Sequence, residues 1–257
     1  MNVRFKKIIK FQNFFLHYSK VQKERVEALS NININIHSGE HVAVIGPSGS
    51  GKTSFLKSIV FALRPSSGKL LFEDIDPWRI SAKKRHKLRA KIFITSQVPH
   101  LPPRQKVLTA VFAGKLAGIN SFMSLFSLLY PQDLDRVKFA LECFGLSEKL
   151  YERVDRLSGG ERQRVSLARA VLSESKLWAI DEPLASLDPT RAEESLINLK
   201  RIASLRDLTF IASLHQTNFA LMHFSRIIGI KKGKIYFDYP PSKIHDDLIK
   251  DLYSVQI

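Results

Sequence analysis

Apolar and polar residues follow two kinds of strand pattern along this chain. Residues 3–16 and 32–36 alternate as half-buried strands do, and the sequence IHSGE predicts a turn before the apolar run 41–45. The run KLWAID at 176–181 is apolar almost throughout, which is typical of a central strand of a parallel sheet. The pattern therefore predicts both a half-exposed sheet and a buried one.

Helical spacing appears between these strands. It predicts helices over 53–63, 161–172, 189–203 and 217–224, with further strands over 68–74, 90–96 and 208–214 and a strand pair over 226–238. Strands that alternate with helices indicate an α/β fold whose parallel sheet is covered on both faces. Three prolines open a stretch with helical spacing at 98–156. We expect a core formed by 1–97 and 157–257, interrupted by a helical subdomain at 98–156.

Composition adds a strong excess of positive charge. The chain has 257 residues, 44% of them hydrophobic, and its formal net charge is +16. Such an excess of positive charge favours binding to polyanions, such as nucleic acid, nucleotides or the inner membrane surface. The basic residues cluster at 83–91 and 231–234, and no nucleic-acid-binding module is recognisable. We interpret the charge as the solvated surface of a membrane-adjacent protein and expect no nucleic-acid partner.

No stretch has the pattern of a membrane span or a signal peptide. The most apolar region, 107–130, is broken by Lys115, Gly118 and Asn120, whereas a span needs about 20 nearly uninterrupted apolar residues. The single cysteine, Cys143, excludes an internal disulfide and fits a reducing compartment. We expect a cytoplasmic protein that does not cross a membrane by itself.

The sequence GPSGSGKT at 46–53 lies directly between an apolar strand and a helical pattern, which disfavours a merely flexible turn. Its glycines let backbone N–H groups wrap phosphates, while Lys52 would neutralise β- and γ-oxygens and Thr53 would ligate Mg²⁺. The motif predicts a nucleoside triphosphate site. Its candidate binding residues are Gly46, Pro47, Ser48, Gly49, Ser50, Gly51, Lys52, Thr53 and Ser54.

The sequence KLWAIDEP supplies two carboxylates. Asp181, at the end of the buried strand, would hold Mg²⁺ through water, and Glu182 would polarise the water that attacks the γ-phosphate. By itself an acid before Pro183 is more often a helix cap. The phosphate loop favours the catalytic interpretation.

A second glycine-rich turn, LSGGERQR at 157–164, precedes another helical run and has the form of a phosphate cradle. With the two motifs above it resembles the ATP-binding cassette (ABC) ATPases, in which this turn is the signature motif. The resemblance implies a P-loop (RecA-like) cassette with an antiparallel β subdomain and a helical subdomain. It also implies ATP and Mg²⁺ as ligands.

The resemblance implies four further functional residues, which occur in the family's order along the chain. Gln97 matches the glutamine loop, which senses Mg²⁺ and the membrane subunit, and His215 matches the switch histidine at the γ-phosphate. Asp188 matches the D-loop near the opposite subunit, and Tyr18 the aromatic residue that stacks on adenine. Each match is weak alone; their order and spacing are specific.

The family's head-to-tail dimer explains why one chain carries two phosphate-binding turns. In such a dimer the signature residues Ser158, Gly159 and Gly160 of one copy contact the γ-phosphate that Lys52 of the other copy holds. Each chain then carries half of two sites. A single chain would bind ATP but hydrolyse it poorly.

One cassette without spans resembles a separate importer subunit, and the stretches KLWAIDEPLASLDPT and SLHQTNFALMHF are most similar to the phosphonate importer ATPases. This implies a permease partner, an indirect substrate-binding-protein partner and a peripheral place at the cytoplasmic face of the inner membrane. The chain departs from the subfamily in its proline-rich glutamine loop, in Glu161 where glutamine is usual, and in a longer loop after Tyr18.

Alternatives remain. The cargo could be phosphate, an amino acid or a metal, because a cassette never contacts its cargo. A soluble ABC ATPase stimulated by nucleic acid would use the positive charge, but the chain lacks a second cassette. An inactive cassette is disfavoured because Lys52, Asp181, Glu182 and His215 are all present.

Apolar side chains near the glutamine loop could receive a coupling helix of the membrane subunit, or could form the helical subdomain's own core. They are Ile119, Phe122, Met123, Leu125 and Phe126.

Overall fold

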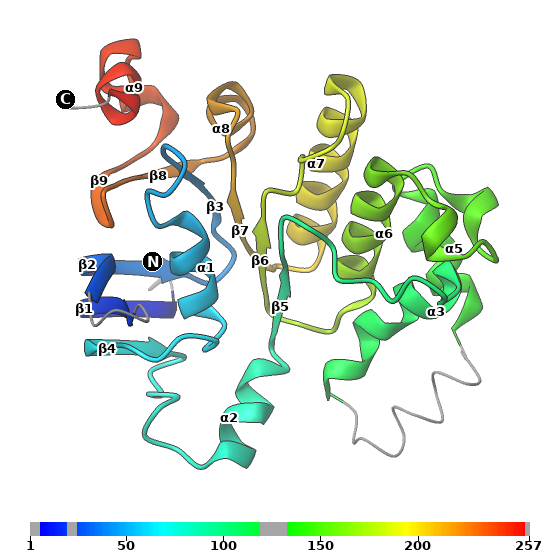
Figure 1. The fold of residues 1–257 in the computed structure, drawn as a ribbon, viewed down its shortest axis with the longest axis horizontal. Helices are drawn as coiled ribbons and strands as arrows, with labels where there is room; N and C mark the ends of the chain where they lie inside the picture. Colours follow the sequence, from blue (N-terminus) through cyan, green and yellow to red (C-terminus); the bar gives the residue numbers. More distant parts are fainter. Residues whose placement is uncertain (1–5, 20–24, 119–132, 255–257) are drawn as a thin grey trace, which may run out of the picture.

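The computed structural model describes residues 6–19, 25–118 and 133–254, which form two sheets with helices around them (Figure 1). A three-stranded sheet lies at one side of the molecule and a six-stranded sheet crosses its middle. Helices cover the six-stranded sheet on the side away from the smaller sheet. Among the helices of these residues, none combines the length and apolarity that a membrane crossing requires. The predicted docking residues at 119–129 lie outside the described residues.

The smaller sheet is antiparallel and has the order β2-β1-β4. Its strands are β1 (Lys7–Ser19), β2 (Arg25–His37) and β4 (Ser67–Phe72). Its apolar side chains, among them Ile9 and Phe14, are buried against the helix that follows the phosphate loop and one face of the large sheet. The alternation in the sequence reflects this one-sided burial.

The large sheet has the order β5-β6-β7-β3-β8-β9 and is parallel except for the pair β8–β9. Its strands are β3 (His41–Ile45), β5 (Ile92–Thr95), β6 (Leu177–Asp181), β7 (Thr209–Ser213), β8 (Arg226–Lys231) and β9 (Lys234–Tyr239). Every residue of β6 and β7 is buried. The carboxyl ends of these strands meet at one edge, where polar residues from different strands come together.

Helices pack around this sheet and form the rest of the core. They are α1 (Lys52–Ile59), α2 (Ala82–Arg89), α3 (Val107–Phe112), α5 (Leu134–Glu142), α6 (Gly159–Leu172), α7 (Pro189–Leu205), α8 (Thr217–His223) and α9 (Asp246–Tyr253), with 3₁₀ segments η1 (Ala113–Gly118), η2 (Ser147–Lys149), η3 (Val154–Arg156) and η4 (Pro241–Lys243). Side chains of α3, α5, α6 and α7 share one apolar cluster with Trp178 and Phe210 of the sheet. This arrangement confirms the predicted α/β class.

Two predicted helix boundaries were wrong. The helix after the phosphate loop ends at Ile59 and does not reach residue 63, because Phe61 takes a left-handed conformation (φ 58°) and its N–H bonds to the carbonyl of Ser58. The signature helix begins at Gly159 and not at Glu161, so both glycines belong to its first turn.

The sequence pattern also missed α2. Only Leu88 of its eight residues is buried, so the segment has no apolar period that would indicate a helix.

Candidate nucleotide-binding and catalytic site

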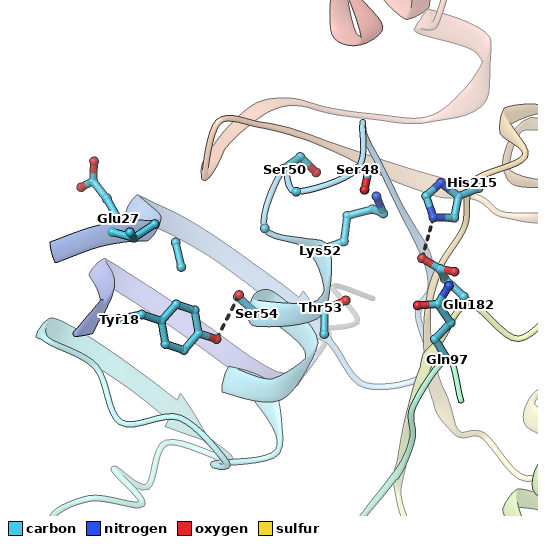
Figure 2. Close-up of a pocket in the computed structure, with 14 residues that line it drawn as sticks. Tyr18, Glu27, Ser48, Ser50, Lys52, Thr53, Ser54, Gln97, Glu182 and His215 are labelled. Atoms are coloured by element: carbon cyan, nitrogen blue, oxygen red, sulfur yellow. Dashed lines mark hydrogen bonds and ion pairs between the residues drawn. The ribbon is translucent and has the colours of Figure 1, made fainter. Parts of the chain in front are cut away.

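A cavity of about 330 Å³ lies at the carboxyl edge of the large sheet and is lined from five directions (Figure 2). The phosphate loop and α1 form its floor, the ends of β1 and β2 one side, and the residues after β5, β6 and β7 the other. Eleven of the predicted site residues line it: Tyr18, Ser48, Gly49, Ser50, Gly51, Lys52, Thr53, Ser54, Gln97, Glu182 and His215. Sequence positions almost 200 residues apart therefore meet at one cavity.

The phosphate loop owes its shape to a close backbone approach. Gly46 has φ 152°, and a Cβ placed there would lie 2.1 Å from the carbonyl oxygen of Ile230, so another residue would displace β8. At the far end of the loop, α1 begins at Lys52 and has no side-chain cap. Its first N–H groups and the positive end of its dipole are thus left for an anion in the cavity.

Lys52 is only 5% exposed, and its ammonium is held by the loop itself. Its Nζ donates to the carbonyl oxygens of Gly46 (2.7 Å) and Pro47 (3.0 Å). Burial lowers the pKa of Lys52, and the carboxylates of Glu182 and Asp181 oppose that shift. The charge therefore lies within the field of the acidic pair, and phosphate oxygens entering the cavity would stabilise it further.

Asp181 lies behind the cavity and is fixed by a residue that the sequence analysis missed. Ser213, the last residue of β7, stands opposite Asp181 in the parallel ladder. Its Oγ donates to Oδ1 of Asp181 at 2.5 Å and accepts from the backbone N–H of Glu182 at 2.9 Å. The sequence does show a serine at the end of an otherwise apolar strand. The hydrogen-bond partner of that serine, however, depends on the register between the two strands.

Glu182 is held at its backbone and at its carboxylate. Its Oε1 lies 2.6 Å from Nε2 of His215, and its φ of 50° is unusual for a residue other than glycine. Gln163 of α6 is 1% exposed and its Nε2 donates to the carbonyls of Glu182 (3.2 Å) and Pro183 (3.3 Å). No motif in the sequence indicates this role of Gln163. The surroundings thus hold a strained backbone that sets the carboxylate at the cavity wall.

Tyr18 stands at the opposite end of the cavity from His215 (Figure 2). Its hydroxyl lies 3.2 Å from Oγ of Ser54 on α1, and 40% of the residue is exposed. Gln97 follows β5 and projects toward Glu182. Tyr18 and Glu182 therefore stand at opposite sides of the phosphate loop (Figure 2), an order that matches the base and the terminal phosphate of a nucleotide.

The signature turn does not line this cavity. Ser158 caps α6: its Oγ accepts from the N–H of Glu161 at 3.2 Å, and Oε2 of Glu161 accepts from the N–H of Ser158 at 2.8 Å. That backbone hydrogen bond lowers the pKa of Glu161. A Cβ on Gly160 would lie 2.8 Å from the carbonyl oxygen of Ser186, so the turn packs directly on the 185–188 loop.

Asp188 lies at the end of that loop and caps α7, accepting from the N–H of Arg191 at 3.0 Å. Among the described residues, Ser158, Gly159, Gly160 and Asp188 thus lie apart from the cavity and on the same side as one another. Two groups of predicted site residues result, one around the cavity and one around the start of α6.

The donor groups in the cavity and directly behind it fit a hard divalent cation. The Thr53 hydroxyl, the Gln97 carboxamide and the Asp181 carboxylate offer oxygen atoms, which Mg²⁺ prefers. Ser50, 3% exposed, has an Oγ with no hydrogen-bond partner among the described residues. A polar atom buried without a partner indicates a site built for a further polar ligand.

Comparison with known proteins decides the family. The family model described as ABC transporter matches residues 29–185, more than half of the chain. This chain belongs to the ABC transporter family. It is an ABC-type ATPase and binds ATP, as the phosphate loop predicts, and the predicted cassette fold is confirmed.

Three comparisons show how near its relatives lie. This ABC ATPase is 47% identical to the phosphonates import ATP-binding protein PhnC 2 of Albidiferax ferrireducens, over 89% of this chain and 83% of that protein. It is 44% identical to PhnC of Polaromonas sp., over 96% of this chain and 89% of that protein. The dimeric cassette MJ0796, solved with ADP and Pi, superposes with a TM-score of 0.80 at 28% identity, covering 91% of this chain and 99% of that one.

Proposed function

We propose that this ABC ATPase is the ATP-hydrolysing subunit of a phosphonate importer and drives uptake through a separate membrane subunit. The observation that carries the hydrolytic role is the convergence of Lys52, Glu182 and His215 on one cavity. The cargo rests on the PhnC relatives, which cover most of this chain.

The nucleotide would lie along the cavity with its adenine on Tyr18 and its phosphates on the loop and α1. The Thr53 hydroxyl would ligate Mg²⁺, with Asp181 and Gln97 completing the oxygen donors through water or directly. The ion would neutralise charge on the β- and γ-oxygens. Glu182, oriented by His215, would accept a proton from water as the water oxygen attacks the γ-phosphorus and the bond to the ADP oxygen breaks.

A second copy of the chain would complete each site. Ser158, Gly159, Gly160 and Asp188 lie apart from their own chain's cavity, and the glycine turn stands at the positive end of α6. We infer that in a head-to-tail dimer the glycine turn contacts the γ-phosphate bound by the partner copy, and that Asp188 lies near the opposite subunit. MJ0796, a dimeric cassette, is similar over almost its whole length.

The membrane subunit would dock beside β5, the edge strand that leads to Gln97. Ile94 is 39% exposed and Val98 is 70% exposed on either side of that residue. A cleft of about 290 Å³ separates β5 from the residues around η1, with Phe93 and Ala117 among its lining. A coupling helix of the membrane subunit placed there would bury exposed apolar surface. Through Gln97 the membrane subunit would respond to whether the cavity holds ATP or ADP.

A chain docked in this way would lie at the cytoplasmic face of the inner membrane. The division into a core of 1–97 and 157–257 and a helical subdomain of 98–156 remains our prediction, and the cleft lies at their proposed boundary.

Deletion of this chain in its own host tests the cargo. Uptake of a radiolabelled alkylphosphonate should disappear, orthophosphate uptake should persist, and the wild-type chain but not Lys52→Ala should restore the loss. Phosphonate uptake that continues undiminished in the deletion strain would exclude the proposed cargo.

A further inference from the structure

Helix α2 carries a concentration of positive charge that the nucleotide site does not use. From residue 73 to residue 91 the chain has seven lysines and arginines against three carboxylates. The helix itself, AKKRHKLR, contains no acidic residue. Leu88 is the one buried side chain of this helix.

Several neighbouring cationic side chains already contact other groups of the protein. Arg85 lies over the ring of Trp78, 4.8 Å from its centroid, and Arg89 donates to the carbonyl of Phe61. Two lysines share one carboxylate, since Nζ of Lys176 lies 2.9 Å from Glu73 and Lys91 also bonds to it. Burial alone would raise the pKa of Glu73, but these two lysines lower it. That carboxylate is therefore ionised and already neutralised.

Asp76, a second carboxylate, pairs with Arg79, whose Nε lies at 3.4 Å. Lys83, Lys84 and Lys87 are exposed and make no ion pair within the described residues. Lys83 and Lys87 are four residues apart and so project from one face of the helix, with Lys84 beside them. Three exposed ammonium groups thus form a cluster without ion pairs among the described residues, which we call the α2 lysine cluster.

The position of the α2 lysine cluster relates it to the membrane. The helix precedes the edge strand β5 and lies at the amino end of that strand, away from the phosphate loop (Figure 1). Ala90, its C-cap residue, lines the cleft beside β5. The helix that carries the cluster therefore ends at the surface proposed to receive the membrane subunit.

We propose that the α2 lysine cluster binds anionic phospholipid headgroups beside the membrane subunit. Its location at the bilayer rests on the proposed function, whereas its charge does not. Lysines are suited to a diffuse anionic surface, to which each contributes through its charge. Readout of nucleic acid uses bidentate arginines and exposed aromatic rings, and here both arginines of α2 and Trp78 are engaged with one another or with the backbone.

Vesicle flotation with the purified full chain, without any membrane subunit, tests the proposal. The chain should float with vesicles that contain phosphatidylglycerol and not with pure phosphatidylcholine vesicles, and added salt should release it. The triple variant K83Q/K84Q/K87Q should bind the anionic vesicles about 100-fold more weakly, since each lysine contributes roughly a factor of five. Its ATPase activity should equal that of the wild type because α2 lies away from the nucleotide cavity.

The matched control is K138Q/K234Q/K243Q, which removes the same charge from exposed lysines of α5, β9 and η4. It should keep most of the vesicle binding. Equal losses in the two triple variants would overturn the proposal, as would an α2-dependent affinity for a DNA duplex with unchanged vesicle binding. Absent ATPase activity in all three proteins would contradict the proposed function and leave the lipid result standing.

Discussion

Nε2 of His215 lies 2.6 Å from Oε1 of Glu182, so the residues that follow two adjacent strands are joined across the cavity wall. β6 and β7 run parallel and in register, which places both residues just beyond the same sheet edge. The contact restrains the side chain of Glu182. A base held in this way loses little conformational freedom when the attacking water arrives.

Replacing His215 by alanine should therefore impair chemistry and leave ATP binding intact. We expect kcat to fall by about 100-fold, the order of loss that follows misplacement of a reacting group. Steady-state hydrolysis and nucleotide titration would measure the two effects separately. His245→Ala, at the exposed start of α9, should behave as wild type. An unchanged kcat in His215→Ala would exclude the orienting role.

Ser213 predicts a second defect, because its hydroxyl is the hydrogen-bond partner of Asp181 and of the Glu182 backbone. Ser213→Ala should lower the free energy of unfolding by about 1–3 kcal/mol, since two buried polar groups lose their partner. It should also raise the Mg²⁺ concentration needed for half-maximal hydrolysis. Ser225→Ala, on an exposed site after α8, is the control. Wild-type Mg²⁺ dependence together with wild-type stability would count against this assignment.

The carboxylate of Glu161 should make the stability of the protein depend on pH. Its folded-state pKa is lowered by the backbone N–H of Ser158, so its stabilisation is present above the ordinary value of 4.5 and is lost as pH falls through the depressed folded value. Glu161→Gln keeps an acceptor oxygen but not the charge at the start of α6. We expect it to be less stable at neutral pH by roughly 0.5 kcal/mol.

Urea unfolding of the two proteins across the acid range would measure that difference, which should shrink as the pH drops below 4.5. Glu148→Gln, an exposed acid of η2, should show no such convergence. A difference in free energy of unfolding between wild type and Glu161→Gln that stays constant across this pH range would refute the charge-based account of the cap.

Local patterns were sufficient for the parts of the fold that depend on local chemistry. The strands 41–45 and 177–181 are apolar runs, and the phosphate loop is a motif whose glycines meet a backbone requirement, so both were predicted from sequence. Ser213 and Gln163 were missed because their partners are set by strand register and by the packing of α6 on the 182–183 turn. No local pattern reports such contacts.

The same reasoning explains the errors at helices. α2 has one buried residue and a run of charges, so its helical state depends on the Ser81 cap and on the anchor provided by Leu88. The early end of α1 depends on the left-handed Phe61, whose ring is buried against the small sheet. Tertiary packing decided both cases.

The central claim is that the nucleotide lies between two copies of the chain, each supplying its Ser158–Gly160 turn to the other. The mass of Glu182→Gln in solution with saturating ATP and Mg²⁺ tests it most directly, because this variant keeps the cavity and blocks hydrolysis. We predict a particle of two chains, which separates into single chains when ATP is removed. Adding Ser158→Arg to this variant should prevent the two-chain particle from forming. A Glu182→Gln protein that binds ATP and stays a single chain at every concentration would contradict the claim.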